Sequence, residues 1–63
     1  MKVNGKVESN PNMTVLELLR SHDLNEHVVV IEVNKEVVPK NEYRTRILVD
    51  TDEVEIMYFV GGG

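Results

Sequence analysis

Residues 28–33 read VVVIEV, an almost unbroken run of β-branched side chains. Such a run is typical of a strand that is covered on at least part of both faces. Asn34 and Lys35 then form a turn, and residues 36–38 form a second, shorter strand. Pro39 ends that strand, because proline lacks the amide donor that a strand ladder needs. The run therefore predicts a well-covered strand followed by a short one.

The stretch before this strand predicts a helix. Thr14 can cap the first free amides, and Glu17, three residues on, can reach back to the Thr14 amide, which makes a capping box. Three apolar residues then recur at helical spacing and give one stripe: Val15, Leu18 and Leu19. We expect the helix to end between residues 21 and 24. A single amphipathic helix of this length is not stable alone, so it should lie on a sheet.

The outer parts of the chain add a hairpin and an irregular segment. Asn4 and Gly5 tolerate positive φ, so they predict a tight turn between two short strands. Residues 41–46 are polar and predict irregular structure with room for a helical turn. Residues 47–49 read ILV and are expected to return to the core, and residues 50–52 predict a turn.

The last strand alternates. Residues 54–60 read VEIMYFV, so one face carries Val54, Ile56 and Tyr58. The other face carries Glu53, Glu55, Met57 and Phe59. If Ile56 points at the helix, Met57 and Phe59 point outward, where a cluster of apolar side chains would mark a contact surface. The alternative is that the sheet curls and buries them in a second small core.

This order of elements predicts an α+β fold, a mixed four- to five-stranded sheet packed on one main helix. The 63 residues make one small domain, which we assign to residues 1–60, with a flexible glycine tail at residues 61–63. A chain this short buries only about 60% of the surface that its unfolded form exposes. It therefore has no room for a deep pocket.

Eleven acidic and seven basic residues give a formal net charge of -4. This charge argues against binding to nucleic acid, whose phosphates would repel the protein, and favours basic protein surfaces. The acidic residues are densest at positions 50–55, where we expect a solvated strand face that could also steer the C-terminus towards a basic partner. No stretch has the roughly 20 apolar residues that cross a membrane, and the N-terminus lacks a signal-peptide run. The expectation is a cytoplasmic protein that binds no membrane.

No conventional catalytic set is visible in the sequence. The chain has no cysteine, and His22 and His27 are five apart, whereas a helical metal pair would usually be four apart. We expect surface histidines and no bound metal or cofactor. The C-terminal carboxylate is chemically inert at neutral pH until it becomes an acyl-adenylate or thiocarboxylate, which needs an enzyme that supplies ATP and Mg²⁺. The glycines at positions 61–63 minimise steric conflict when such a tail enters a narrow slot.

Several stretches, in this order, resemble the thiamine-biosynthesis sulfur carrier family, whose members are ubiquitin-like. They are Asn4-Gly5, the helix start TVLELL at 14–19, the strand VVVIEVN at 28–34, VPK at 38–40, the strand at 52–60, and Gly62-Gly63. The resemblance covers essentially the whole chain. Each internal motif is only moderately specific, but their order in so short a chain is quite specific.

The resemblance implies a β-grasp (ubiquitin-like) fold and the role of a carrier rather than an enzyme. It implies that Gly63 is adenylated by a ubiquitin-activating-like adenylyltransferase, which holds the ATP and Mg²⁺. A sulfur donor system would then convert Gly63 to a thiocarboxylate, and the sulfur would pass to thiazole synthase. Gly62 belongs with Gly63 to the reactive diglycine. The residues expected to bind partners are Met57, Phe59, Val60 and Gly61.

Other functions stay open at this point. A sulfur carrier for molybdopterin synthesis is a close relative, although such proteins are commonly longer. A ubiquitin-like protein modifier, joined through Gly63 to lysines of other proteins, would begin with the same adenylate. A binding module with an incidental tail would need neither Gly62 nor Gly63.

Overall fold

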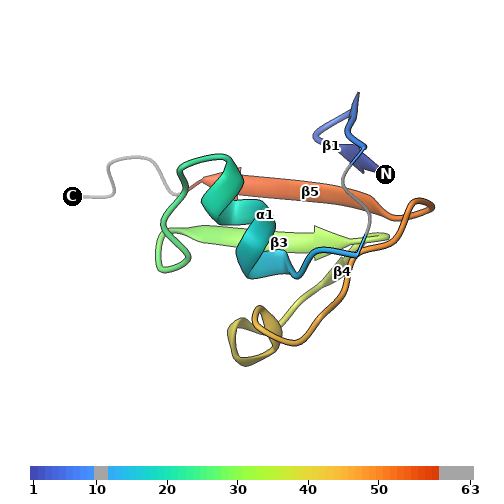
Figure 1. The fold of residues 1–63 in the computed structure, drawn as a ribbon. Coiled ribbons are helices and arrows are strands. Elements are labelled where there is room, and N and C mark those ends of the chain that lie inside the picture. Colours follow the sequence, from blue (N-terminus) through green and yellow to red (C-terminus); the bar gives the residue numbers. More distant parts are fainter. Residues whose placement is uncertain (10–11, 59–63) are drawn as a thin grey trace.

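A single α-helix packs on one face of a five-stranded sheet in the computed structural model, which describes residues 1–9 and 12–58 (Figure 1). The predicted α+β class and mixed sheet are confirmed. The elements in chain order are β1 (Lys2–Val3), β2 (Lys6–Val7), α1 (Val15–Ser21), β3 (Val29–Val33), β4 (Glu36–Val37), the 3-10 turn η1 (Lys40–Glu42) and β5 (Glu53–Tyr58).

The last strand of the chain is the centre of the sheet. The strand order is β2-β1-β5-β3-β4, and β5 runs parallel to β1 and antiparallel to β3. Two hairpins, β1–β2 and β3–β4, form the two edges. The sheet is therefore held together by β5, because among the described strands this one pairs with both hairpins.

Both predicted turns are confirmed, and both run through two residues with positive φ, which the sequence predicts for Asn4 and Gly5. Asn4 has φ 50° and Gly5 has φ 82°, and the second turn has φ 53° at Asn34 and 70° at Lys35. Positive φ at both central positions is the geometry of a type I′ turn, whose twist matches that of the flanking strands. The predicted strand at 36–38 is one residue shorter in the structure, although the Val38 amide still donates to the Ile31 carbonyl at 2.9 Å.

The predicted capping box begins the helix. The Thr14 amide donates to Glu17 Oε1 at 2.9 Å, and the Glu17 amide donates to Thr14 Oγ1 at 3.1 Å. The helix ends at Ser21, inside the predicted window. No helix in the described part of the chain is long and apolar enough to cross a bilayer.

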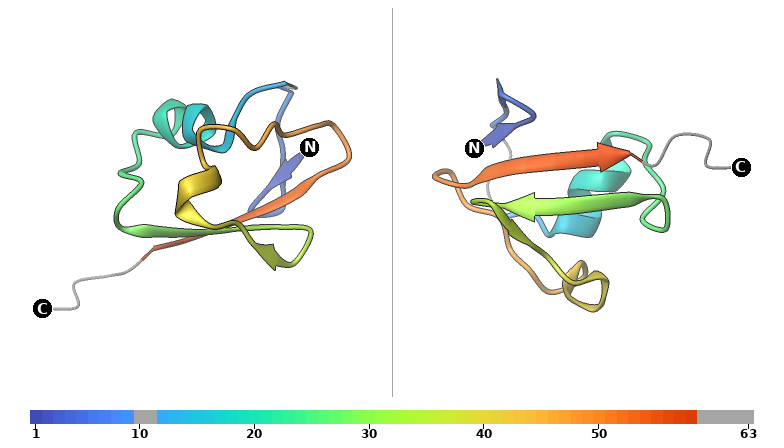
Figure 2. Two further views of the ribbon diagram at one scale, coloured as in Figure 1. Left: turned by 90° about the horizontal axis from the view of Figure 1, so that it is seen from below. Right: turned by 180° about the vertical axis from the view of Figure 1, so that it is seen from behind.

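The core lies between α1 and the inward face of β3 and β5. Figure 2 shows α1 and η1 on the same side of the sheet. The core residues with 0% of their surface exposed come from three segments, namely α1, β3 and the extended segment around residue 48: Val15, Leu18, Leu19, Val29, Ile31 and Leu48. Tyr43, which directly follows η1, also belongs to the core, because only 2% of its surface is exposed.

The prediction that residues 47–49 return to the core together is wrong for two of the three. Leu48 is fully buried, but Ile47 and Val49 are 48% and 44% exposed. The segment is extended, with a bridge between Ile47 and Thr14 and a bond from the Leu48 amide to the Met13 carbonyl. Side chains alternate in extended backbone, so only the middle one points inward.

The prediction of a solvated acidic run at positions 50–55 is wrong for Asp52, which is only 7% exposed. One carboxylate oxygen accepts from the Val49 amide at 2.9 Å and the other from Asn34 Nδ2 at 3.0 Å. Asn34 Oδ1 accepts in turn from the Glu53 amide at 3.0 Å. Asp52 is buried because it ties the turn after β3 to the start of β5.

Candidate functional site

Only one residue that the sequence assigns to the site lies within the described part of the chain, namely Met57. The others lie outside the described residues, so their roles stay predictions: Phe59, Val60, Gly61, Gly62 and Gly63. The described structure therefore shows the strand that leads to the predicted tail and the surfaces around it.

Met57 points away from the helix, as the alternation predicts. It is 39% exposed, whereas the preceding Ile56 is 4% exposed and belongs to the core. In the ladder between β3 and β5, Met57 lies opposite Val30 and Ile56 lies opposite Ile31. Since paired residues share a face, Val30 and Met57 form an apolar pair on the side of the sheet that α1 does not cover.

This uncovered side, which we call the outward face, includes Val30, Glu32, Val37, Glu55 and Met57, and towards β1 it continues with Glu53, Lys2 and Val7. The register places Glu32 opposite Glu55 on one side and opposite Val37 of β4 on the other. Our sequence reasoning did not include Val30, Glu32 and Val37 in the site. The sequence could have indicated Val30 and Glu32, because the period-2 alternation in VVVIEV puts both on the face of the strand that Ile31 does not occupy.

The end of β5 is also uncovered on the helix side. Tyr58 shares that face with Ile56 but is 51% exposed, and it lies opposite Val29 at the start of β3. The neighbouring Val28 is 48% exposed. Apolar side chains are thus open to solvent on both faces where β5 leads towards residues 59–63, so a partner could hold this strand from both sides.

A long-range hydrogen bond holds the middle of β5. Asn4, at the turn of the first hairpin, accepts a hydrogen bond from the Ile56 amide through its side-chain oxygen at 2.8 Å. The Asn4 amide donates to the Val54 carbonyl at 2.9 Å. These two bonds extend the pairing of the short β1 and fix β5 against the start of the chain.

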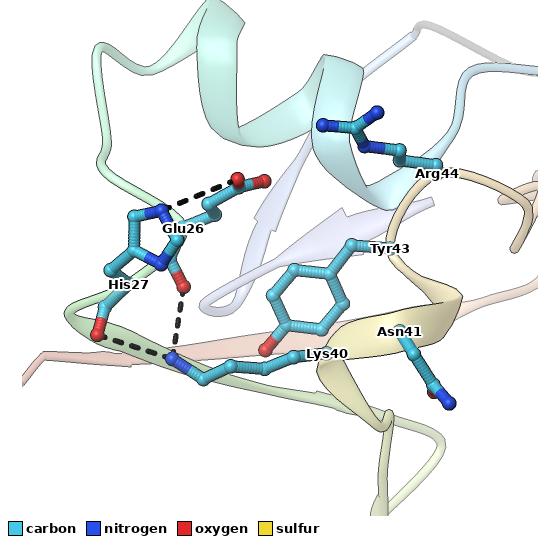
Figure 3. Close-up of a pocket in the computed structure, with 6 residues that line it drawn as sticks. All are labelled: Glu26, His27, Lys40, Asn41, Tyr43 and Arg44. Carbon is cyan, nitrogen blue, oxygen red and sulfur yellow. Dashed lines mark hydrogen bonds and ion pairs between the residues drawn. The ribbon is translucent and has the colours of Figure 1, made fainter.

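A hollow of about 310 Å³ lies on the helix side of the sheet, between residues 26–27 and η1 (Figure 3). It is lined by Glu26, His27, Lys40, Asn41, Tyr43 and Arg44. The Lys40 ammonium donates to the main-chain carbonyls of Glu26 and His27, at 3.1 Å each. The His27 ring lies 3.6 Å from the Glu26 carboxylate. Lys40 thus fastens the loop before β3 to the turn that follows β4.

The chemistry of this hollow favours a structural role. Burial raises the pKa of the Tyr43 phenol, a hydrogen bond with the Ile31 backbone lowers it, and the Glu26 carboxylate raises it again. The phenol therefore stays neutral at physiological pH, and the one ammonium group is already bonded to two carbonyls. Within residues 1–9 and 12–58 no group of three or more histidine, aspartate or glutamate side chains is arranged to hold a metal ion.

Comparison with known proteins identifies the family. The model of the ThiS family matches residues 1–63. This chain belongs to the ThiS family. A sulfur carrier protein ThiS from Bacillus subtilis (strain 168) is 44% identical over 50 residues, which cover 79% of this chain and 76% of that protein. A thiazole synthase from Paramagnetospirillum magneticum is 37% identical over 62 residues, which cover 97% of this chain but only 19% of that protein.

A solved ThiS structure has the same fold. The crystal structure of the thiamine biosynthesis protein ThiS from Geobacter metallireducens superposes with a TM-score of 0.78 at 35% identity, covering 98% of this chain and 96% of the other. The predicted ubiquitin-like β-grasp fold is confirmed. Family and fold place the chain among the sulfur carriers of thiamine biosynthesis, which are carrier proteins rather than enzymes.

Proposed function

We propose that Gly63, through its C-terminal carboxylate, carries sulfur as a thiocarboxylate and delivers it for formation of the thiazole ring of thiamine. The observation that carries the proposal is the family match over residues 1–63, which includes the terminal glycines. The uncovered end of β5, directly before residues 59–63, supports it further. In this proposal residues 1–60 are the folded domain that partners bind, and residues 61–63 are the reactive tail.

The proposed reaction has two steps, both on the Gly63 carboxyl group. A carboxylate oxygen attacks the α-phosphorus of ATP, pyrophosphate leaves, and a mixed anhydride with AMP forms. Sulfur at the oxidation level of sulfide, supplied by a sulfur donor system, then attacks the carbonyl carbon, and AMP leaves. ATP and Mg²⁺ belong to the activating partner. This chain supplies the carboxylate, and Gly62 lets the backbone enter a narrow slot.

Two partners follow from this chemistry. The first is an adenylyltransferase resembling the ubiquitin-activating enzymes, and the second is thiazole synthase. The Paramagnetospirillum magneticum thiazole synthase supports the second, because a segment similar to this chain makes up 19% of that protein. Carrier and synthase joined in one polypeptide are expected to work together. Because activation uses ATP, we place the reaction in the cytoplasm.

The body of the carrier is proposed to dock through the end of the last strand. Met57 supplies an exposed apolar side chain on the outward face, next to Val30. Phe59, Val60 and Gly61 continue the sequence towards the tail and complete the proposed contact. Docking of the folded part offsets the conformational entropy that a glycine tail loses when it is ordered.

Thiol-specific alkylation tests the proposal sharply, because the chain has no cysteine. After incubation with the adenylyltransferase, ATP and a sulfur donor, a thiol reagent at neutral pH should label one position, and fragmentation should place the label on Gly63. The labelling step is needed because oxidation of one of the three methionines changes the mass almost as much as replacing oxygen with sulfur. A chain without residues 62–63 is the control. Absence of any label on the full chain would contradict the proposal.

Growth experiments separate the proposal from its alternatives. Deletion of the gene should abolish growth without thiamine and leave molybdoenzymes active, whereas a molybdopterin carrier would give the reverse result. Covalent adducts of higher mass on lysines of other proteins would instead indicate a protein modifier. Retained function without Gly62 and Gly63 would indicate a binding module.

A further inference from the structure

Two carboxylates face each other on the outward face. Glu32 of β3 and Glu55 of β5 are direct partners in the antiparallel ladder. Like charges directly opposite each other across two strands destabilise a sheet. Among the described residues the ion pairs are Glu8–His22 and Glu26–His27, so no described basic side chain forms an ion pair with Glu32 or Glu55, and Lys2 on the same face lies opposite Glu53 instead. The free chain therefore keeps an unfavourable pair in the middle of its exposed sheet.

Apolar side chains frame this pair on two sides. Val30 and Met57 are the next pair on the same face, two residues along the ladder towards the end of β5, and Val37 of β4 lies opposite Glu32 on its other side. Met57 and Val37 are 39% and 62% exposed. Since α1 packs on the opposite face, no described helix covers this mixture of charge and apolar surface (Figure 2). Such a surface fits a cationic group with an apolar stem.

We propose that the outward face docks on the adenylyltransferase and that the enzyme places one arginine side chain between Glu32 and Glu55. This inference rests on the proposed function, because the occupant is the activating partner. A guanidinium group offers five donors in a planar fork and can bond two carboxylates at once, whereas a lysine ammonium acts as a point charge. The methylene stem of the arginine can lie against Val30 and Met57. The net charge of -4 adds long-range attraction to such a basic surface.

The proposal predicts opposite effects on folding and binding. In the free chain, removal of one charge relieves the repulsion, so Glu55→Gln and Glu32→Gln should each raise the urea midpoint of unfolding. In the complex, the same change removes a charge-assisted hydrogen bond to the arginine. Each variant should therefore bind the adenylyltransferase roughly 10-fold more weakly or worse. Carboxylates with a purely structural role would lower the urea midpoint when they are replaced.

The experiment compares the full chain with Glu32→Gln, Glu55→Gln, the double variant and Glu36→Gln. Glu36 is an exposed glutamate of β4 that lies opposite the inward-facing Val33, so its variant has the same net charge without altering the outward face. Binding is measured by titration calorimetry at two salt concentrations. The loss in the double variant should be smaller than the product of the single losses, since both carboxylates bind one guanidinium. Binding by Glu36→Gln should stay within about twofold of the wild type.

Several outcomes would overturn this inference. One is that Glu32→Gln and Glu55→Gln bind like the wild type, and another is that Glu36→Gln weakens binding equally. A lower urea midpoint in the glutamine variants would assign the pair a structural role. Dimerisation of the free chain that Glu55→Gln abolishes would make a second copy the occupant. If the wild type acquires the thiocarboxylate but the glutamine variants bind the adenylyltransferase like the wild type, the proposed arginine contact is wrong and the proposed function stands. If the wild type never acquires it, the proposed function fails.

Discussion

The two faces of the β3–β5 pair differ sharply in exposure, although both belong to the same two strands. On the inward face, the opposed pair Ile31 and Ile56 is 0% and 4% exposed, whereas Met57, one residue further on, is 39% exposed on the outward face. The inward face stabilises the fold, and the outward face offers mixed apolar and acidic surface. In a domain of 63 residues, one pair of strands thus provides both the core and the surface proposed for recognition.

The register of β5 decides which face each residue occupies. A slip of one residue would turn every core side chain of the strand outward and every exposed one inward. The Asp52–Asn34 hydrogen bonds hold the start of the strand, and the bond from the Ile56 amide to Asn4 holds its middle. The difference between the faces can therefore be tested at the faces themselves and at the contacts that set the register.

The largest effect should come from the core position. Ile56→Ala should lower the free energy of unfolding by about 2–5 kcal/mol, because it removes a buried side chain and leaves a cavity. Such a loss is a large part of the stability of so small a domain. Met57→Ala, one residue away, should change the free energy of unfolding by less than about 0.5 kcal/mol. Urea unfolding of both variants measures the comparison, and equal losses would show that the two faces do not differ as described.

A smaller loss is expected where the register is set. Asp52→Ala should lower the free energy of unfolding by about 1–3 kcal/mol, because the Val49 amide and the Asn34 side chain lose their acceptor. The exposed Asp50→Ala in the same turn is the matched control and should change little. Hydrogen exchange of β5 amides should accelerate in Asp52→Ala. Unchanged stability in that variant would mean that the register does not depend on this carboxylate.

The helix that covers the inward face should be less sensitive. Thr14→Ala removes half of the capping box and should lower the free energy of unfolding by about 1 kcal/mol. Thr51→Ala, at an exposed turn position, is the control. Circular dichroism during urea unfolding measures both. A loss in Thr51→Ala as large as that in Thr14→Ala would argue against a specific contribution from the cap.

The smallest effect is a pH dependence at the edge of the inward face. Burial raises the pKa of Tyr43 in the folded protein, so the unfolded chain loses the phenol proton first as pH rises. The contribution of the neutral Tyr43 phenol to the free energy of unfolding is therefore complete below about pH 10 and is lost as the pH rises above that value. Tyr43→Phe should flatten the fall in stability at alkaline pH, whereas Tyr58→Phe, at an exposed position, should leave it unchanged. Thermal unfolding between pH 8 and 11 measures this, and identical slopes in both variants would contradict it.

Much of the fold could be predicted from local sequence signals. The two hairpin turns, the capping box and the alternation of the last strand each act over a few residues, and the structure confirms all of them. The burial of Asp52 could not be predicted, because its partner Asn34 lies 18 residues away. The second role of Asn4 could not be predicted either. The sequence indicates only a turn residue, but the Asn4 side chain accepts a hydrogen bond from the Ile56 amide, 52 residues away.

The candidate site was predictable only in part for the same reason. Alternation puts Met57 on the face opposite to that of Ile56 but leaves open whether a curled sheet buries it, and the structure shows that Met57 is 39% exposed. Its partner Val30 and the opposition of Glu32 to Glu55 depend on the register between β3 and β5, which is a tertiary property. The assignment of Ile47 and Val49 to the core failed because apolar composition alone does not show which way an extended segment alternates.

The central position of β5 has a consequence for synthesis of the protein on the ribosome. A nascent chain that has emerged only as far as residue 52 contains both hairpins and the helix, but it lacks the strand that joins them. A chain that ends before residue 53 therefore cannot form the sheet, and cellular proteases would treat it as an unfolded polypeptide. A chain that reaches the folded state thus already contains the strand that leads to the proposed tail.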